Sequence, residues 1–429
     1  MSRRLLITLG VLALIVVLFV LVFTGVIPGL RKDITANKVA LSMWGVFDAP
    51  DAFSAVINAY KAQAPNVSIA YKQFAPEDYE RELVNALAAG KGPDMFMAHN
   101  TWLPKHYDKM LPLTGESLPI ATFRNLFPRV VEQDFAPDGL IYALPLYVDS
   151  LALFYNKDAF DNAGRAVPPK NWEQVNALIP KLRAIDRSGK ITKAAVAIGG
   201  SPKSINRATD LLSLIMMQGG APMVSEGFGG AQFAVKGAAG LDFYTQFVDP
   251  KSPLYTWNDQ LHYSLDAFAE GSVAMMFNYQ YNIAALKQKN PFLMFGVAGM
   301  PQPRTAANRV DYANYFGLAV SGRSRNAAAA WDFIKFLTTN ENVSAAYLRA
   351  NGHAPALRVL IDAQSDESDA GVFARQALTA RSYPQIDNTE VERVMGELIE
   401  NAIYGKLPKD RALRQAEDAI TTLIRERAK

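Results

Sequence analysis

Hydrophobic positions in the first part of the chain switch between the spacing of strands and the spacing of helices. Short apolar runs predict strands at Lys38–Trp44, Val67–Tyr71 and Met95–Ala98. Between these runs, apolar side chains recur at helical spacing and stop before Pro65 and Gly90. The inner faces of the two predicted helices are Phe53, Val56, Ile57 and Tyr60, then Tyr79, Leu83, Val84 and Leu87. This alternation predicts the α/β fold class, with a mostly parallel sheet covered by helices.

The rest of the chain continues in the same style. A chain of 429 residues is too long for one compact core, so we expect two lobes. Asn171 with Gln174 three residues later has the pattern of a capping box, which predicts a helix beginning at Trp172. Further helices are expected at 206–218, 234–247, 266–270 and 327–337 and near the C-terminus, and further strands at 151–155, 273–277, 295–300 and 318–320.

The N-terminal end carries one long apolar segment. The run Leu5–Phe23 and its apolar extension reach the roughly 20 residues that a membrane-spanning helix needs, and Arg3 and Arg4 precede it. We therefore expect residues 1–30 to form a transmembrane anchor and residues 31–38 a tether, with the body outside the cytoplasm. The alternative is a cleaved signal peptide and secretion, but the core is longer than about 7–15 residues and no Ala-x-Ala pattern follows it.

Composition and motifs exclude several kinds of function. The formal net charge of +3 is too small for this length to indicate nucleic-acid binding, and without cysteine there are no disulfides or thiolate sites. The sequence has no phosphate-binding loop, no Gly-x-Ser-x-Gly and no His-Glu-x-x-His. The histidines share no metal-ligand spacing. We expect no enzyme activity, no cofactor and no metal site.

Several segments, taken in order, resemble one known family. Asp138–Trp172 reads as a turn, a strand, a crossing, a second strand and a capped helix. Similar matches are GKGPDMFMAHN at 90–100, FAEGSVAMMFNYQY at 268–281, the helical pair 327–355, and Tyr404-Gly405-Lys406 before a final helix. Together they resemble the bacterial extracellular solute-binding proteins of ABC sugar importers, family 1, which includes maltose-binding protein.

The resemblance implies a two-lobed, type II periplasmic-binding-protein-like fold. Lobe 1 would comprise 39–148 and 300–352, and lobe 2 would comprise 149–299 and 353–429. Three hinge crossings are expected at 147–150, 297–303 and 351–358, with the ligand between the lobes. The resemblance also implies that the protein binds a sugar or oligosaccharide, works as a monomer and delivers its ligand to ABC permease subunits.

Sugar binding needs flat aromatic faces for C–H patches and planar polar groups for hydroxyls. Such groups are expected on loops at strand ends, as with Trp44, Phe47 and Asn100. The resemblance implies that Asp149 accepts sugar hydroxyls and that Tyr281 replaces a tryptophan that commonly stacks on sugar. The expected ligand contacts are Trp44, Phe47, Asn100, Trp102, Tyr147, Asp149, Trp257, Asn278, Tyr279, Tyr281, Tyr312, Asn314 and Tyr315.

Two other functions stay open from the sequence. The same fold could bind ferric iron through Tyr279 and Tyr281, or a polyamine through Asp94 or Asp149. An exported glycosidase would need two carboxylates about 5–10 Å apart across the cleft. Only Asp149 has a clear place there, so the glycosidase is the weaker alternative.

Overall fold

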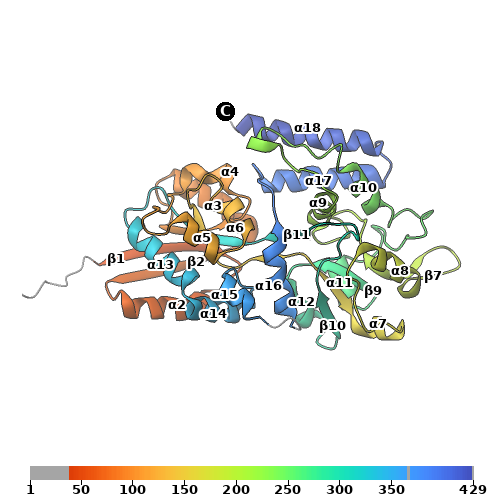
Figure 1. The fold of residues 1–429 in the computed structure, drawn as a ribbon, viewed down its shortest axis with the longest axis horizontal. Coiled ribbons are helices and arrows are strands. Elements are labelled where there is room, and N and C mark those ends of the chain that lie inside the picture. The colour runs from red at the N-terminus through yellow and green to blue at the C-terminus, as the bar shows by residue number, and fades with distance from the viewer. Residues whose placement is uncertain (1–37, 365–367, 428–429) are drawn as a thin grey trace, which may run out of the picture.

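Two α/β bodies lie side by side, and helix α16 (Asp369–Thr379) runs between them (Figure 1). The structure is a computed structural model that describes residues 38–364 and 368–427. The predicted anchor at 1–30 and all of the predicted tether except Lys38 lie outside the described residues. In the part of the chain that is described, no helix is long and apolar enough to cross a membrane.

The helices follow the chain through both bodies. The α-helices are α2 (Pro50–Gln63), α3 (Pro76–Ala88), α4 (Leu103–His106), α5 (Ile120–Leu126), α6 (Arg129–Phe135), α7 (Lys157–Asn162), α8 (Trp172–Leu182), α9 (Ala208–Gln218), α10 (Ala238–Thr245), α11 (Ser264–Ala269), α12 (Asn282–Lys289), α13 (Ala327–Thr339), α14 (Glu341–Asn351), α15 (Arg358–Asp362), α16, α17 (Asn388–Ile403) and α18 (Lys409–Arg427). The 3₁₀ helices are η1 (Tyr107–Lys109) and η2 (Glu226–Phe228).

The strands form two five-stranded sheets and one small three-stranded sheet. The strands are β1 (Val39–Val46), β2 (Val67–Phe74), β3 (Met95–His99), β4 (Ala143–Pro145), β5 (Asp149–Ser150), β6 (Ala152–Asn156), β7 (Ala184–Ile185), β8 (Ile191–Ala197), β9 (Val273–Asn278), β10 (Phe295–Ala298), β11 (Asp311–Asn314), β12 (Phe316–Val320) and β13 (Ala380–Arg381).

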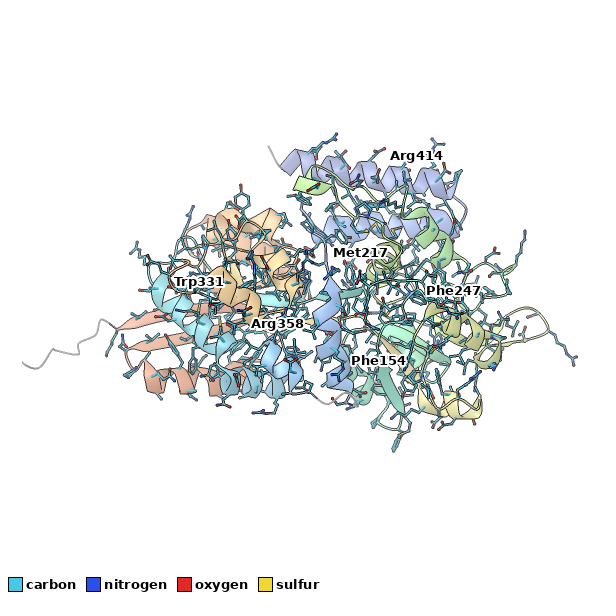
Figure 2. The ribbon with its side chains drawn as sticks, in the orientation of Figure 1. Phe154, Met217, Phe247, Trp331, Arg358 and Arg414 are labelled. Carbon is cyan, nitrogen blue, oxygen red and sulfur yellow. The ribbon has the colours of Figure 1, made fainter. Side chains whose placement is uncertain are left out.

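The first lobe has the sheet order β2-β1-β3-β12-β4. The first three of these strands are parallel, with Val39 opposite Val67 and Met43 opposite Met95, as their strand–helix alternation predicted. Strand β12 returns from far along the chain and pairs antiparallel with β3 and β4. Trp331 of α13, labelled in Figure 2, is buried in the core of this lobe.

The second lobe has the order β10-β6-β9-β8-β7, and most of its pairs are antiparallel. Only β8 and β9 run parallel, so the expectation of a mostly parallel sheet is wrong for this lobe. The reason is that β6 enters the sheet directly from the crossing at β5 and pairs antiparallel with both β9 and β10. Asn171 caps α8 by accepting the amide proton of Gln174, which confirms the predicted helix start.

The small sheet β13-β11-β5 joins the lobes. Strand β5 carries the chain from the first lobe to the second, β11 carries it back, and α16 with β13 makes the third crossing. The second crossing was predicted at 297–303, but Met300 is buried in the second lobe's core, so this prediction is wrong. The third crossing was predicted at 351–358, but Ala356, Leu357 and Ile361 pack in the first lobe's core. The chain therefore stays in the first lobe through α15, because these apolar side chains need that core to be buried.

One buried amide connects the crossings. Gln376 of α16 donates from Nε2 to Ser150 Oγ at 2.9 Å and to the Leu151 carbonyl at 2.8 Å. Its Oε1 accepts the amide proton of Met300 at 2.6 Å and a guanidinium proton of Arg309 at 3.2 Å. One planar side chain of the third crossing, which is only 2% exposed, thus binds both the first crossing and the segment that leads into β11.

We expect Gln376→Leu to lower the free energy of unfolding by about 2–4 kcal/mol, because it leaves buried backbone and hydroxyl groups without partners. Urea titration measures the change. The matched control is Gln63→Leu, at an exposed position on α2, where the change should stay within about 0.5 kcal/mol. Equal stabilities for the two variants would contradict the role given to Gln376.

Candidate functional site

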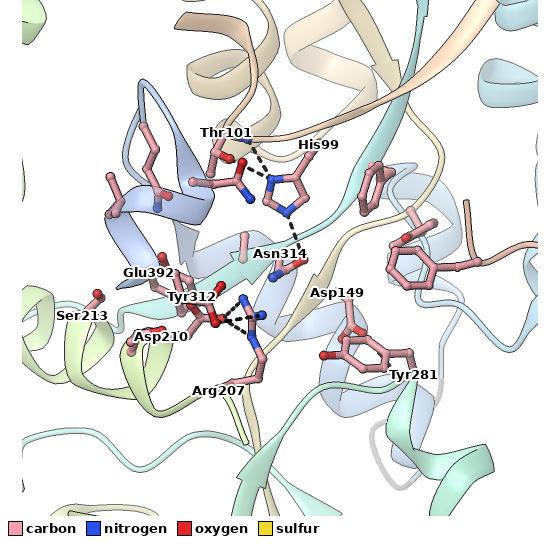
Figure 3. A pocket seen from close by; sticks show the side chains of 18 of the residues that line it. His99, Thr101, Asp149, Arg207, Asp210, Ser213, Tyr281, Tyr312, Asn314 and Glu392 are labelled. Carbon is pink, nitrogen blue, oxygen red and sulfur yellow. Dashed lines mark hydrogen bonds and ion pairs between the residues drawn. The ribbon is translucent and has the colours of Figure 1, made fainter. Parts of the chain in front are cut away.

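A cavity of about 520 Å³ lies where the two lobes and the hinge sheet meet (Figure 3). Its volume falls within the about 300–1,000 Å³ that is usual for small-molecule sites. The walls come from the loop after β1, the end of β3, the hinge strands β5 and β11, the N-terminal end of α9 and the first turns of α17. Most of these wall segments are strand ends or helix starts, where side chains and backbone groups point out of the packed layers.

Two aromatic rings offer exposed faces to this cavity. Tyr281 is 49% exposed, and its ring stacks on the buried ring of Tyr279 at 5.6 Å and 16°. Phe47 is 57% exposed and has a φ of 67°, a left-handed conformation that is uncommon for a residue other than glycine. Such strain persists where the surrounding structure fixes it, and at this site it holds an apolar ring at the cavity wall.

Asp149 lies on β5 at the hinge and is 2% exposed. Its Oδ1 accepts amide protons from Ser150 at 2.7 Å and Gln280 at 3.1 Å, and its Oδ2 accepts from Tyr281 at 3.4 Å. Burial raises the pKa of Asp149 to about 7, although these backbone amides and the nearby His353 favour the charged form. The carboxyl group therefore changes its protonation state near neutral pH.

An ion-paired cluster at the start of α9 lines the cavity on the side away from Tyr281 (Figure 3). Arg207 binds Asp210 Oδ2 through Nε at 2.8 Å and Nη2 at 2.7 Å, and its Nη1 lies 3.6 Å from Glu392. Tyr279 also donates its hydroxyl proton to Asp210 at 2.7 Å. Burial opposes the charge of Arg207, but the two carboxylates outweigh it and raise the pKa of the guanidinium.

His99 occupies the end of β3 beside the hinge strand β11. Its Nδ1 pairs with Thr101 Oγ1 at 2.8 Å and its Nε2 with Asn314 Oδ1 at 3.2 Å. Burial lowers the pKa of His99 to about 4, although the hydrogen bond to Asn314 opposes this, so the imidazole is neutral at neutral pH. On the other side, His353 stacks on Tyr147 at 3.9 Å and binds Asp48 at 2.8 Å.

The structure brings together six of the thirteen expected ligand contacts. Those that line the cavity are Phe47, Tyr147, Asp149, Tyr281, Tyr312 and Asn314. Those that do not line it are Trp44, Asn100, Trp102, Trp257, Asn278, Tyr279 and Tyr315.

The tryptophans outside the cavity have structural partners. Trp44 packs at 4.6 Å on Phe74 of the neighbouring strand β2, and it does not line the cavity. Trp257 is fully buried in the second lobe and donates its indole proton to Ser204 at 2.9 Å. Trp102 lies behind the wall and donates its indole proton across the lobes to Asn388 at 3.1 Å.

The other expected contacts that lie outside the cavity form hydrogen bonds or ring contacts with neighbouring residues. Asn100 and Tyr315 both donate to Asp134 Oδ2, at 3.0 and 2.8 Å, and Ser382 donates to Oδ1. Asn278 accepts from the Tyr279 amide and from the side chain of Asn282. Tyr279 supports Tyr281 from behind, so the two tyrosines do not share one exposed face.

Sequence reasoning missed Arg207, Asp210, Glu392, His99 and His353. An Arg and an Asp three residues apart at the start of a predicted helix indicate an ion pair, and that signal was available. The left-handed φ of 60° at Arg207, which turns the guanidinium toward the cavity, has no signature in the sequence. Glu392 and the histidines reach the site only through tertiary packing.

Two α/β lobes, a three-strand hinge and a cavity between them define a two-lobed ligand-binding protein. The model of the bacterial extracellular solute-binding protein family matches residues 46–344, and the chain belongs to this family. The family consists of binding proteins rather than enzymes. The predicted family, its extracytoplasmic place and the absence of enzyme activity are thereby confirmed.

Individual relatives agree with this assignment. A maltotriose-binding protein of Pyrococcus abyssi is 23% identical over 358 residues, which cover 80% of this chain and 72% of that protein. The solved sugar-binding protein MalE of Xanthomonas citri has a TM-score of 0.76 at 20% identity, covering 91% of this chain and 98% of that one. The cyclic α-maltosyl-1,6-maltose-binding protein of Arthrobacter globiformis has a TM-score of 0.75 at 20% identity, covering 91% of this chain and 100% of that one. At these identities the solved structures show the fold.

The buried Asp134 predicts a pH dependence of stability. Burial raises its pKa from 3.8 to about 7, although Ser382, Asn100 and Tyr315 oppose the rise. The protonated carboxyl therefore contributes stability that is fully present below about pH 4 and is lost as the pH rises through about 7. Relative to Asp134→Asn, the wild type should lose up to about 1.4 kcal/mol per pH unit in this window.

Urea unfolding of both proteins at several pH values between about 4 and 8 measures this difference. Comparing the two proteins at each pH cancels the contributions of all other titrating groups. A constant difference, or one that moves in favour of the wild type as the pH rises, would contradict a raised pKa at Asp134.

Proposed function

We propose that the chain binds a sugar or short oligosaccharide in the interlobe cavity and delivers it to the permease of an ABC importer. The observation that carries this proposal is the pairing of exposed ring faces, Tyr281 and Phe47, with buried polar groups around one cavity. Aromatic rings cover the C–H faces of a pyranose, and planar polar groups bind its hydroxyls. The maltotriose-binding relative and the sugar-binding structural neighbours support this ligand class.

The polar groups are arranged to discriminate hydroxyl positions. Asp149 is an acceptor at the hinge, while Asn314 and Thr101 present an amide and a hydroxyl already oriented by His99. Groups that are held in place before binding lose little freedom when the ligand arrives, which favours affinity and specificity. Displacement of water from these buried groups by a matching hydroxyl keeps their hydrogen bonds satisfied.

Ligand contacts on both lobes couple binding to closure. Phe47 belongs to the first lobe and Tyr281 to the second, so a sugar between them stabilises the closed arrangement. Closure would proceed by rotation about the three crossings, where few backbone angles need to change. The closed form is then the one that permease subunits recognise.

The predicted anchor at 1–30 completes this proposal. A membrane-spanning segment there, followed by a tether of a few residues, would keep a monomeric binding body near its permease at high effective concentration. The body itself would remain outside the cytoplasmic membrane, as in the family to which it belongs.

The ferric-iron alternative has less support. Tyr279 is buried and commits its hydroxyl to Asp210, which leaves Tyr281 as the exposed phenol of that pair. Within the described residues, no group of three or more His, Asp or Glu side chains is placed to hold a metal ion. An intense phenolate-to-iron absorption band on adding ferric ion would reverse this ranking.

We expect Tyr281→Ala to weaken saccharide binding by about five- to tenfold, because loss of one stacking face costs about 1–1.5 kcal/mol. Isothermal titration calorimetry against maltose, maltotriose, mannobiose and other short saccharides measures the affinity. The control is Tyr107→Ala, which removes a tyrosine that is 60% exposed outside the cavity. If the wild type binds none of the saccharides, or if both variants bind equally, the proposed site is overturned.

A further inference from the structure

The cavity carries a charge opposite to that of the whole chain. Four carboxylates line it, Asp48, Asp149, Asp210 and Glu392, against one permanently charged cation, Arg207. Among the described residues, acidic side chains therefore outnumber Lys and Arg in the lining by three, while the chain as a whole has a formal net charge of +3. A concave site of one sign concentrates ligands of the opposite sign, so the lining favours a cation.

Most of this negative charge is already neutralised within the protein. Asp210 binds Arg207 and Tyr279, with Glu392 as a further neighbour of the guanidinium. Asp48 binds His353 and also accepts the hydroxyl proton of Tyr347.

Asp149 differs from the other three carboxylates. It is 2% exposed, accepts only backbone amide protons, and forms no ion pair with any residue in the described ranges. Removing a carboxylate from water is costly unless an opposite charge compensates for it. A charged group on the ligand can supply that compensation.

An exposed aromatic face lies directly beside this carboxylate. The Tyr281 amide donates to Asp149, and its ring stands next to the carboxylate at the cavity wall (Figure 3). An ammonium group at such a place makes two favourable interactions: a cation–π interaction with the ring face and an ion pair with the carboxylate. The same ring covers the C–H face of a pyranose, so one ligand can satisfy both groups.

We propose that the ligand is an amino sugar, with its ammonium group on Asp149 and its ring on Tyr281. This inference rests on the proposed saccharide function and narrows it. A polyamine shares the ammonium chemistry, but it has no ring to cover the exposed faces of Tyr281 and Phe47.

The test compares sugars that differ only at nitrogen. Calorimetry near neutral pH would titrate the protein with glucosamine, galactosamine and mannosamine, each against its parent hexose and its N-acetyl derivative, and with spermidine. We expect at least one amino sugar to bind about tenfold or more tightly than both of its neutral counterparts, as one added ion pair in a buried site allows.

Other outcomes separate this inference from the function on which it rests. Equal or tighter binding of the neutral sugars overturns the amino-sugar inference and leaves saccharide binding intact. Binding of spermidine alone, or of none of these compounds and no short saccharide, overturns both.

Variants test the residue assignment. Asp149→Asn should bring the ratio of amino-sugar to hexose affinity close to one, and this ratio cancels any loss of shared hydroxyl contacts. Glu392 is a more exposed residue of the lining. Glu392→Gln should lower the ratio of amino-sugar to hexose affinity by a smaller factor, about threefold, because solvent screens the charge that it removes. It keeps the inference testable if Asp149→Asn does not fold.

The matched control is Glu390→Gln, two residues away on α17 and paired with Arg393 outside the cavity. Its affinity ratio should equal that of the wild type. An unchanged ratio in both Asp149→Asn and Glu392→Gln, or a drop of the same size in Glu390→Gln, would remove these carboxylates from ligand recognition.

Discussion

The two lobes depend on the buried hinge, where polar backbone from three crossings must find partners away from water. Gln376 provides them by binding Ser150, Leu151 and Met300 together. Asp311, which is fully buried, adds Arg309 and the hydroxyl of Thr379. Because buried polar groups are costly without partners, the hydrogen bonds of Gln376 and Asp311 fix which segments lie side by side and where the lobes can rotate.

The cavity follows from that arrangement. The hinge sheet places Asp149 and Asn314 on adjacent antiparallel strands, opposite each other in register. The first lobe adds Phe47 and the second adds Tyr281, so aromatic faces flank a polar floor. The proposed ligand therefore contacts both lobes and the hinge at once, which is the condition for coupling occupancy to closure.

The sequence predicted much of the fold and less of the site. The parallel order of β1, β2 and β3 followed from alternating periodicities, because those elements are local and consecutive. The third crossing was misplaced, because the choice between two cores for Ala356 and Ile361 depends on distant packing partners. Trp44 and Trp257 were predicted as ligand contacts mainly because they are aromatic. Whether a ring is exposed to the cavity depends instead on its packing partners, which are Phe74 for Trp44 and the second lobe's core for Trp257.

The sequence alone determined the first strands and helices of the first lobe, the family to which the chain belongs and the aromatic and acidic character of the hinge region, since these depend on local pattern and composition. Only the tertiary structure decided which rings face the cavity, that Arg207 bridges Asp210 and Glu392, and that Asp149 forms no ion pair among the described residues. The physical reason is that charge compensation and exposure are properties of neighbours. In this fold the neighbours of Asp149 come from segments more than a hundred residues apart.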